Sequence, residues 1–281
     1  MSLEMYEESK LPPICTIGIA AGKGGVGKSS FTVNLALALQ KLGYKVGIMD
    51  TDLYGPSVRK MLPEDRLPVQ KGQIFTPALC NGIKVISMAY FRKEDEAAAV
   101  RAPIANNIIT SFIKNVDWGD IDYLLVDFPP GTGDIQLTLA QRANLSGAIM
   151  ITTPQEVSLM DVRRAMHLFA QVKVPIIGVV ENMSYYINPT TKQREYLFGK
   201  EGGRRLALEA GVPLLGQIPI DPIICQNGDR GTSLFASSQA EAKPIVENFI
   251  NIANQVLSHL SILKDLTREE LTHFELIWRG L

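Results

Sequence analysis

Seven short and almost continuously apolar runs alternate along the chain with longer segments in which apolar residues recur every three or four positions. The apolar runs lie at residues 14–20, 45–50, 83–88, 122–128, 147–153, 175–182 and 213–219. A strand is apolar on both sides when both faces of its sheet are covered. Right-handed strand–helix–strand units provide that cover. The pattern predicts an α/β fold with a mostly parallel, doubly wound sheet and helices on both faces.

The length of 281 residues and the 46% hydrophobic content suit one large domain. We expect an N-terminal tail over residues 1–13, a single domain over 14–262 and a C-terminal helix over 263–281. Thr267 with Glu270 forms a capping box at the start of that last helix. Its apolar stripe is flanked by charges of both signs, which favours packing on the domain or on a partner over binding a membrane surface. Residues 62–82 read as a loop with a short hairpin at the sheet edge.

The charged residues are balanced, with 28 basic and 29 acidic side chains. This balance gives no general attraction to nucleic acid, and no uncharged run approaches the roughly 20 residues that span a membrane. The three cysteines, Cys15, Cys80 and Cys225, are far apart and lack CxxC spacing. Such usage is typical of a reducing compartment, so we expect a cytoplasmic protein.

The segment Gly22–Ser29 reads GKGGVGKS, which fits the phosphate-binding pattern GxxxxGK[ST] and lies between a predicted strand and a predicted helix. Backbone amides of such a loop and the following helix N-terminus bind phosphate groups. Lys28 is placed to reach the β and γ phosphates, and Ser29 to offer its hydroxyl to Mg²⁺. The motif predicts a P-loop ATPase domain. The expected nucleotide contacts are Gly22, Lys23, Gly24, Gly25, Val26, Gly27, Lys28, Ser29 and Ser30.

Two further segments place carboxylates at the ends of predicted strands. DTDLYGPS contains Asp50 and Asp52, and DYLLVDFPPGTGD contains Asp127. Asp127 has the position of a Walker B acid, which suits the water shell of Mg²⁺. Asp50 and Asp52 are suited to a magnesium-bound water or to the attacking water. An isolated DxD pair more often only terminates a strand and caps a turn, but beside a P-loop the functional interpretation is favoured. Asp134 is suited either to capping the next helix or to switching.

Together with GVVENMSYY and LFGKEGGRRLALEAGVPLLGQIPIDP, these segments resemble the Mrp/NBP35 (ApbC-type) ATPases over residues 14–260. These belong to the deviant Walker A P-loop NTPases, with MinD, ParA and the nitrogenase iron protein. The resemblance implies a slow, Mg²⁺-dependent ATPase that forms a homodimer. It implies that Lys23 reaches the partner's nucleotide, that Asp50 lies near the magnesium shell, that Asp52 orients the attacking water and that Asn182 reads adenine. The expected catalytic residues are therefore Lys23, Lys28 and Asp52.

The same resemblance implies a carrier that binds an iron–sulfur cluster and passes it to apoproteins or scaffold proteins. This sequence departs from the family after ENMSYY, where the family usually has CPxC and this chain has Asn188 and Thr191 at the cysteine positions. Neither side chain offers the thiolate that iron–sulfur clusters require. Any cluster is therefore expected to be labile or absent, with Cys225 as the candidate replacement ligand. The alternative hypothesis is an ATP-dependent dimerisation switch of MinD or ParA type that acts on a protein partner or surface.

Overall fold

The computed structural model describes residues 14–52, 55, 57–91, 102–237 and 240–269. Its centre is an eight-stranded sheet with strand order β12–β9–β8–β1–β7–β2–β6–β5, in which only the edge strand β5 runs antiparallel to its neighbour. The α/β prediction is confirmed. The strands are β1 (Cys15–Ala21), β2 (Val46–Asp50), β5 (Ala78–Cys80), β6 (Ile83–Ser87), β7 (Tyr123–Asp127), β8 (Gly147–Thr152), β9 (Ile176–Glu181) and β12 (Leu214–Gln217).

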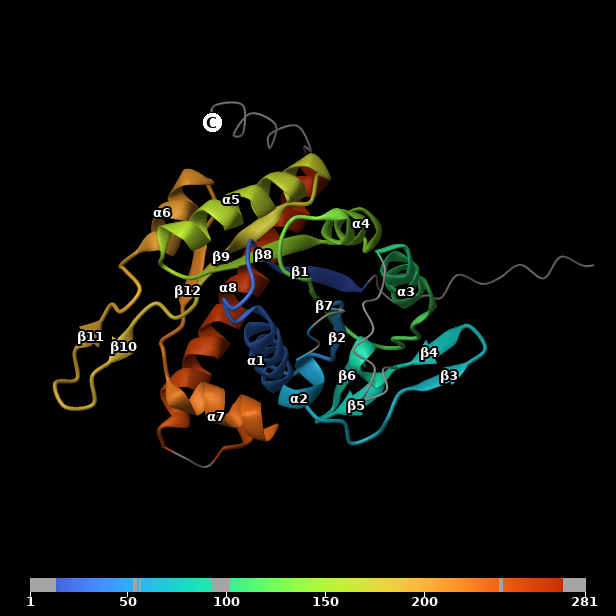
Figure 1. Cartoon of the computed structure of the whole chain (residues 1–281), viewed down its shortest axis with the longest axis horizontal. Coiled ribbons are helices and arrows are strands. Elements are labelled where there is room, and N and C mark those ends of the chain that lie inside the picture. The colour runs from blue at the N-terminus through green and yellow to red at the C-terminus, as the bar shows by residue number, and fades with distance from the viewer. Residues whose placement is uncertain (1–13, 53–54, 56, 92–101, 238–239, 270–281) are drawn as a thin grey trace, which may run out of the picture.

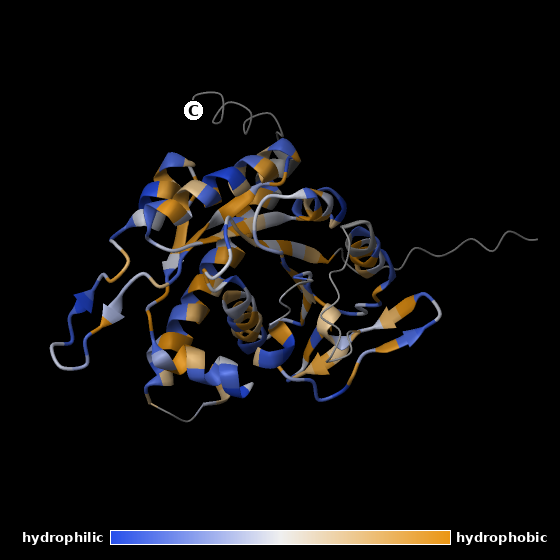
Figure 2. Cartoon of the chain, viewed as in Figure 1, coloured by the Kyte–Doolittle hydropathy of each residue, from blue (hydrophilic) through white to orange (hydrophobic). Residues whose placement is uncertain are grey.

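Helices cover both faces of this sheet, as Figure 1 shows. One layer contains α1 (Lys28–Lys41), α2 (Val58–Met61), α7 (Pro222–Arg230), the short turn η2 (Leu234–Ala236) and α8 (Ala242–Glu269). The other contains α3 (Ala102–Asn115), α4 (Asp134–Arg142), α5 (Glu156–Gln171) and α6 (Gly202–Glu209). A further turn, η1 (Met88–Tyr90), follows β6. Figure 2 shows hydrophobic residues along the strands and hydrophilic residues on the outer sides of the helices.

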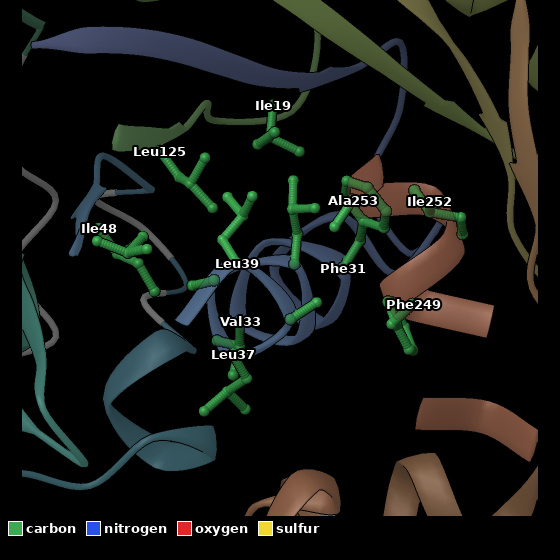
Figure 3. Close-up of a cluster of buried hydrophobic side chains, with 14 of the residues drawn as sticks. Ile19, Phe31, Val33, Leu37, Leu39, Ile48, Leu125, Phe249, Ile252 and Ala253 are labelled. Atoms are coloured by element: carbon green, nitrogen blue, oxygen red, sulfur yellow. The ribbon is translucent and has the colours of Figure 1, made fainter. Parts of the chain in front are cut away.

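Helix α1 packs on β1, β2 and β7 and lies beside α8, which packs on β9 and β12. In Figure 3 the side chains of α1 meet Ile19, Ile48 and Leu125 from the strands and Phe249 from α8. The ring centroids of Phe31 and Phe249 are 6.3 Å apart. Truncating one such buried aromatic side chain to alanine costs about 3–5 kcal/mol. This packing holds the first turn of α1, and with it the preceding loop, rigidly against the sheet.

Two small hairpins project from the body of the molecule. The segment 62–82 contains β3 (Val69–Lys71) and β4 (Ile74–Thr76) and then enters the sheet as β5, so the predicted edge excursion is present. The second hairpin, which we call the arm, pairs β10 (Tyr186–Ile187) with β11 (Arg194–Glu195) and extends away from the sheet (Figure 1).

Helix α8 runs without a break from Ala242 to Glu269. Thr267 therefore lies inside a helix and does not start one, so the boundary that we predicted from the capping box is wrong. The physical reason is that residues 251–269 contain no glycine or proline, and a helix already formed continues through a capping pattern. The apolar stripe at 271–281 and the tail at 1–13 lie outside the described residues. None of the described helices combines the length and the apolar character needed to cross a membrane.

Candidate functional site

The loop between β1 and α1 has a backbone that only glycine adopts easily. Gly25 and Gly27 have φ angles of 80° and 81°, in the left-handed region, and Gly27 caps the N-terminus of α1. At Gly22 the constraint is space, because an added Cβ would lie 2.1 Å from the backbone carbonyl carbon of Asp161 in α5. The backbone amides of such a loop and the helix N-terminus that follows it are the groups that bind phosphate in proteins.

A cleft of about 310 Å³ opens in front of this loop. It brings together the loop, the segment after β2 and the segment after β7, three stretches that are far apart in the sequence. The lining residues are Lys23, Gly24, Gly25, Val26, Gly27, Lys28, Ser29, Ser30, Asp52, Ser57, Met61 and Pro130. Most of the residues that we expected at the nucleotide therefore lie in one cleft.

The floor of the site is a buried cluster of one lysine and two aspartates. The register of β2 and β7 places Asp50 beside Asp127, and both side chains are fully buried. The Lys28 Nζ donates to Asp127 Oδ1 at 2.7 Å and is itself only 7% exposed. Ser87 donates to Asp50 Oδ2 at 2.9 Å, and the backbone N–H of Asp52 donates to Asp50 Oδ1 at 3.1 Å. One cation thus faces two carboxylates in a site with little solvent.

The carboxylate of Asp127 has an unused oxygen. Among the residues that the structure describes, its Oδ2 is buried and accepts no hydrogen bond. A buried acceptor without a donor is costly unless a water or an ion completes it. Hard carboxylate and hydroxyl oxygens are the ligands that Mg²⁺ prefers, and Ser29 supplies a hydroxyl in the same cleft. The residues therefore fit a magnesium ion held by Ser29 and Asp127, directly or through water, with Asp50 alongside.

Burial, together with the negative charge of Asp127, raises the pKa of Asp50 to about 7. A carboxyl whose pKa is higher in the folded state than in the unfolded state loses its stabilising effect as the pH rises toward the folded value. Without Mg²⁺ or nucleotide, Asp50 should therefore destabilise the fold increasingly between about pH 4 and pH 7. Each unit of pKa shift corresponds to about 1.4 kcal/mol.

We expect Asp50→Asn to become more stable relative to the wild type as the pH rises from 5 to 8, when both are unfolded with urea in EDTA. The difference between their free energies of unfolding removes the contribution of titrating residues outside the Asp50–Asp127 pair. A difference that does not change with pH would show that Asp50 is ionised throughout.

Asn182 follows β9, at the same end of the sheet as the loop, but it is not among the lining residues of the cleft. Its side-chain amide donates to the Val26 carbonyl at 2.8 Å, so it braces the back of the loop. Gln136 of α4 braces the segment that follows β7, because its side-chain amide donates to the carbonyls of Pro129 and Pro130. Asp134 lies in the first turn of α4, where Gly133 is the capping residue.

Sequence reasoning missed Gln136, Ser87 and Thr32 as parts of the site. Thr32 was open to detection, because it lies four residues after Lys28 and so on the same side of α1. Ser87 contacts Asp50 only through the pairing of β2 with β6, which no local pattern reveals.

Residues 15–257 match the model of the ParA-type family described as the NUBPL iron-transfer P-loop NTPase. The chain belongs to this family. The resemblance to the Mrp/NBP35 group is thereby confirmed.

Three curated relatives illustrate the similarity. The chain is 40% identical over 260 residues to an iron-sulfur cluster carrier protein of Aquifex aeolicus, covering 91% of this chain and 71% of the relative. It is 44% identical over 248 residues to one of Synechocystis, covering 85% and 70%. It is also 40% identical over 257 residues to an iron-sulfur protein required for NADH dehydrogenase in Arabidopsis thaliana mitochondria, covering 91% and 82%.

Solved structures agree with the NUBPL-type assignment. A nucleotide-binding protein of Archaeoglobus fulgidus in complex with ADP is 37% identical, with a TM-score of 0.68 and coverage of 77% of this chain and 86% of that chain. The septum site-determining protein MinD of Pyrococcus horikoshii, complexed with Mg-ADP, has a TM-score of 0.61 at 21% identity, with coverage of 89% and 99%. The second likeness shows a shared fold only.

The cysteines of this NUBPL-type chain lie apart. Cys15 and Cys80 are buried in the sheet, and burial raises the pKa of the Cys80 thiol to about 11. Cys225 is exposed on α7, where the carboxylate of Asp229, 3.6 Å from its sulfur, raises its pKa. A thiol held protonated in this way is a weak metal ligand. Within the described ranges, no group of three or more histidine, cysteine, aspartate or glutamate side chains could hold a metal ion.

Proposed function

We propose that this chain is a Mg·ATP-dependent ATPase that carries iron–sulfur clusters to apoproteins in the cytoplasm. The observation that carries the nucleotide half is the buried Lys28–Asp127 pair under a glycine-rich loop, with an Asp127 oxygen left for a metal. The cluster half rests on relatives that are 40% and 44% identical and are named as iron-sulfur cluster carrier proteins.

Each residue of the site has a separate task in this proposal. The loop amides bind the phosphates, Lys28 neutralises their charge, and Ser29 and Asp127 hold Mg²⁺, which would screen the phosphate charge during hydrolysis. Asp52 lies in the same cleft and orients the attacking water. One side-chain N–H of Asn182 donates to the Val26 carbonyl, and its second N–H donates to the adenine ring. Because catalysis here consists of positioning and charge neutralisation, slow hydrolysis fits a carrier.

The proposal includes a homodimer whose closed form is favoured by ATP. It is supported by Lys23, which lines the cleft and is suited to contact a nucleotide held by a second copy. We expect light scattering to show a dimer in the presence of a non-hydrolysable ATP analogue, and Lys23→Gln to remain monomeric. Lys60→Gln on α2 is the control. A wild-type monomer under every condition would refute the dimer.

The arm explains why cargo should be held weakly. The Asn188 Oδ1 accepts from the backbone N–H groups of Thr190 and Thr191, at 2.9 and 3.1 Å, and its amide donates to Glu195 at 2.7 Å. These bonds close the tip of the arm. Asn188 is thus a turn residue at the position where the family usually has a cysteine, and its neutral amide is a poor ligand for iron.

We therefore expect anaerobic reconstitution with iron and sulfide to give a cluster that chelators remove within minutes. Absorption and Mössbauer spectroscopy measure the cluster before and after the chelator is added. Cys225→Ser should reduce the reconstituted iron, and Cys80→Ser is the control because its thiol is buried. A stable [4Fe-4S] centre at one per dimer that survives Cys225→Ser would contradict both statements about the cargo.

A further inference from the structure

Thr32 presents a fully buried hydroxyl next to the nucleotide cleft. It lies in the second turn of α1, four residues after Lys28, and a buried hydroxyl is expected to have a hydrogen-bond partner. Two acceptors lie within reach of its Oγ1. Asp127 Oδ1 is 2.9 Å away and the Lys28 carbonyl oxygen is 3.1 Å away.

The second contact is ordinary, because threonine inside a helix often donates to the carbonyl four residues earlier. The first is not explained by helix geometry. It joins α1 to the end of β7, across 95 residues of sequence, and reaches the one carboxylate of the cluster that has an unused oxygen.

The hydrogen bonds of Asp127 are distributed unevenly over its two oxygens. Lys28 and Thr32 both donate to Oδ1, whereas Oδ2 accepts nothing from the described residues. Asp50, its neighbour, has a donor on each oxygen. Because rotation about the last side-chain bond of an aspartate is soft, its donors decide which oxygen faces the site.

Lys28 has a second task, since it also neutralises the phosphates once a nucleotide is bound. A lysine that is shared between Asp127 and the phosphates restrains the Asp127 carboxylate less than a lysine that contacts this carboxylate alone. The Thr32 hydroxyl is fully buried, so the phosphates do not compete with Asp127 for it. We propose that Thr32 is a positioning residue that holds Asp127 Oδ1 and thereby keeps Oδ2 directed to the magnesium shell of bound nucleotide. The inference rests on the proposed binding of Mg·ATP.

Calorimetric titration of ATP, in EDTA and at a series of Mg²⁺ concentrations, tests this role without relying on turnover. Thr32→Val keeps the shape and removes the donor. It should bind ATP in EDTA as the wild type does, within about twofold, because without Mg²⁺ the direction of Asp127 Oδ2 does not affect ATP binding. The gain in affinity that Mg²⁺ brings should fall about tenfold, the size of one hydrogen bond to a charged group. Thr32→Ser, which restores the hydroxyl, should recover that gain.

Thr110→Val is the matched control, because Thr110 in α3 makes the same contact to the carbonyl four residues earlier, at 2.7 Å, far from the cleft. It should behave as the wild type. An unchanged Mg²⁺ effect in Thr32→Val would overturn the inference while leaving Mg·ATP binding intact. A wild type that does not bind Mg·ATP would overturn both the inference and the proposed function.

Discussion

A chain with alanine in place of Lys28 is expected to bind ATP at least about 100-fold more weakly than the wild type. The lysine is the single cation in the described floor of the cleft, and it faces both Asp127 and the place where phosphates bind. Without it, phosphate charge would be added to a site that already holds two buried carboxylates. Calorimetric titration with Mg·ATP measures the loss.

The same change should also destabilise the fold, by about 3–5 kcal/mol, because it leaves a buried carboxylate without its partner. The double variant Lys28→Ala with Asp127→Asn removes both charges, so it should recover stability in urea without recovering ATP affinity. Lys41→Ala, at the far end of α1, is the control for loss of a lysine. Binding that returns together with stability in the double variant would show that Lys28 acts through folding alone.

The second large effect is expected at Asp52, where asparagine should preserve nucleotide affinity and lower turnover by about 100-fold or more. The carboxylate lines the cleft, and its Oδ1 accepts from the Gly55 N–H at 3.1 Å. Asparagine keeps an oxygen for that bond, so the substitution removes the charge while preserving the turn. Phosphate release and calorimetry on the same preparation separate turnover from binding.

Asp117→Asn is the matched control, because Asp117 accepts from the Gly119 N–H at 3.1 Å in a similar exposed turn far from the cleft. It should leave turnover unchanged. If Asp52→Asn hydrolyses ATP at the wild-type rate, a different residue positions the attacking water.

Much of this architecture could be predicted from short segments of sequence. The apolar runs identify strands because a sheet covered on both faces needs them, and the glycine-rich loop is recognisable because its backbone angles and its contact with α5 exclude other residues. The magnesium role of Asp127 could also be predicted, since an acidic residue at the end of an apolar strand in a P-loop protein is typical of a magnesium site. These features depend on local chemistry.

The remainder depends on contacts between distant segments. Burial and the neighbouring charge of Asp127 raise the pKa of Asp50, and both follow from the order of the strands, which a single sequence does not specify. The bond from Asn182 to Val26 joins residues 156 positions apart and depends on how the loops pack. The helix start predicted from the capping box at Thr267 was wrong because α8 continues through this local pattern.

Cluster transfer under the control of nucleotide tests the central claim most directly. Wild-type chain and Lys28→Ala, both reconstituted anaerobically, are mixed with an apoenzyme that needs a [4Fe-4S] cluster, and recovery of its activity is followed with and without Mg·ATP. The proposal predicts recovery faster than with free iron and sulfide, at a rate that Mg·ATP changes several-fold for the wild type and does not change for Lys28→Ala. Recovery no faster than with free iron and sulfide, or equal sensitivity of both chains to Mg·ATP, would contradict it.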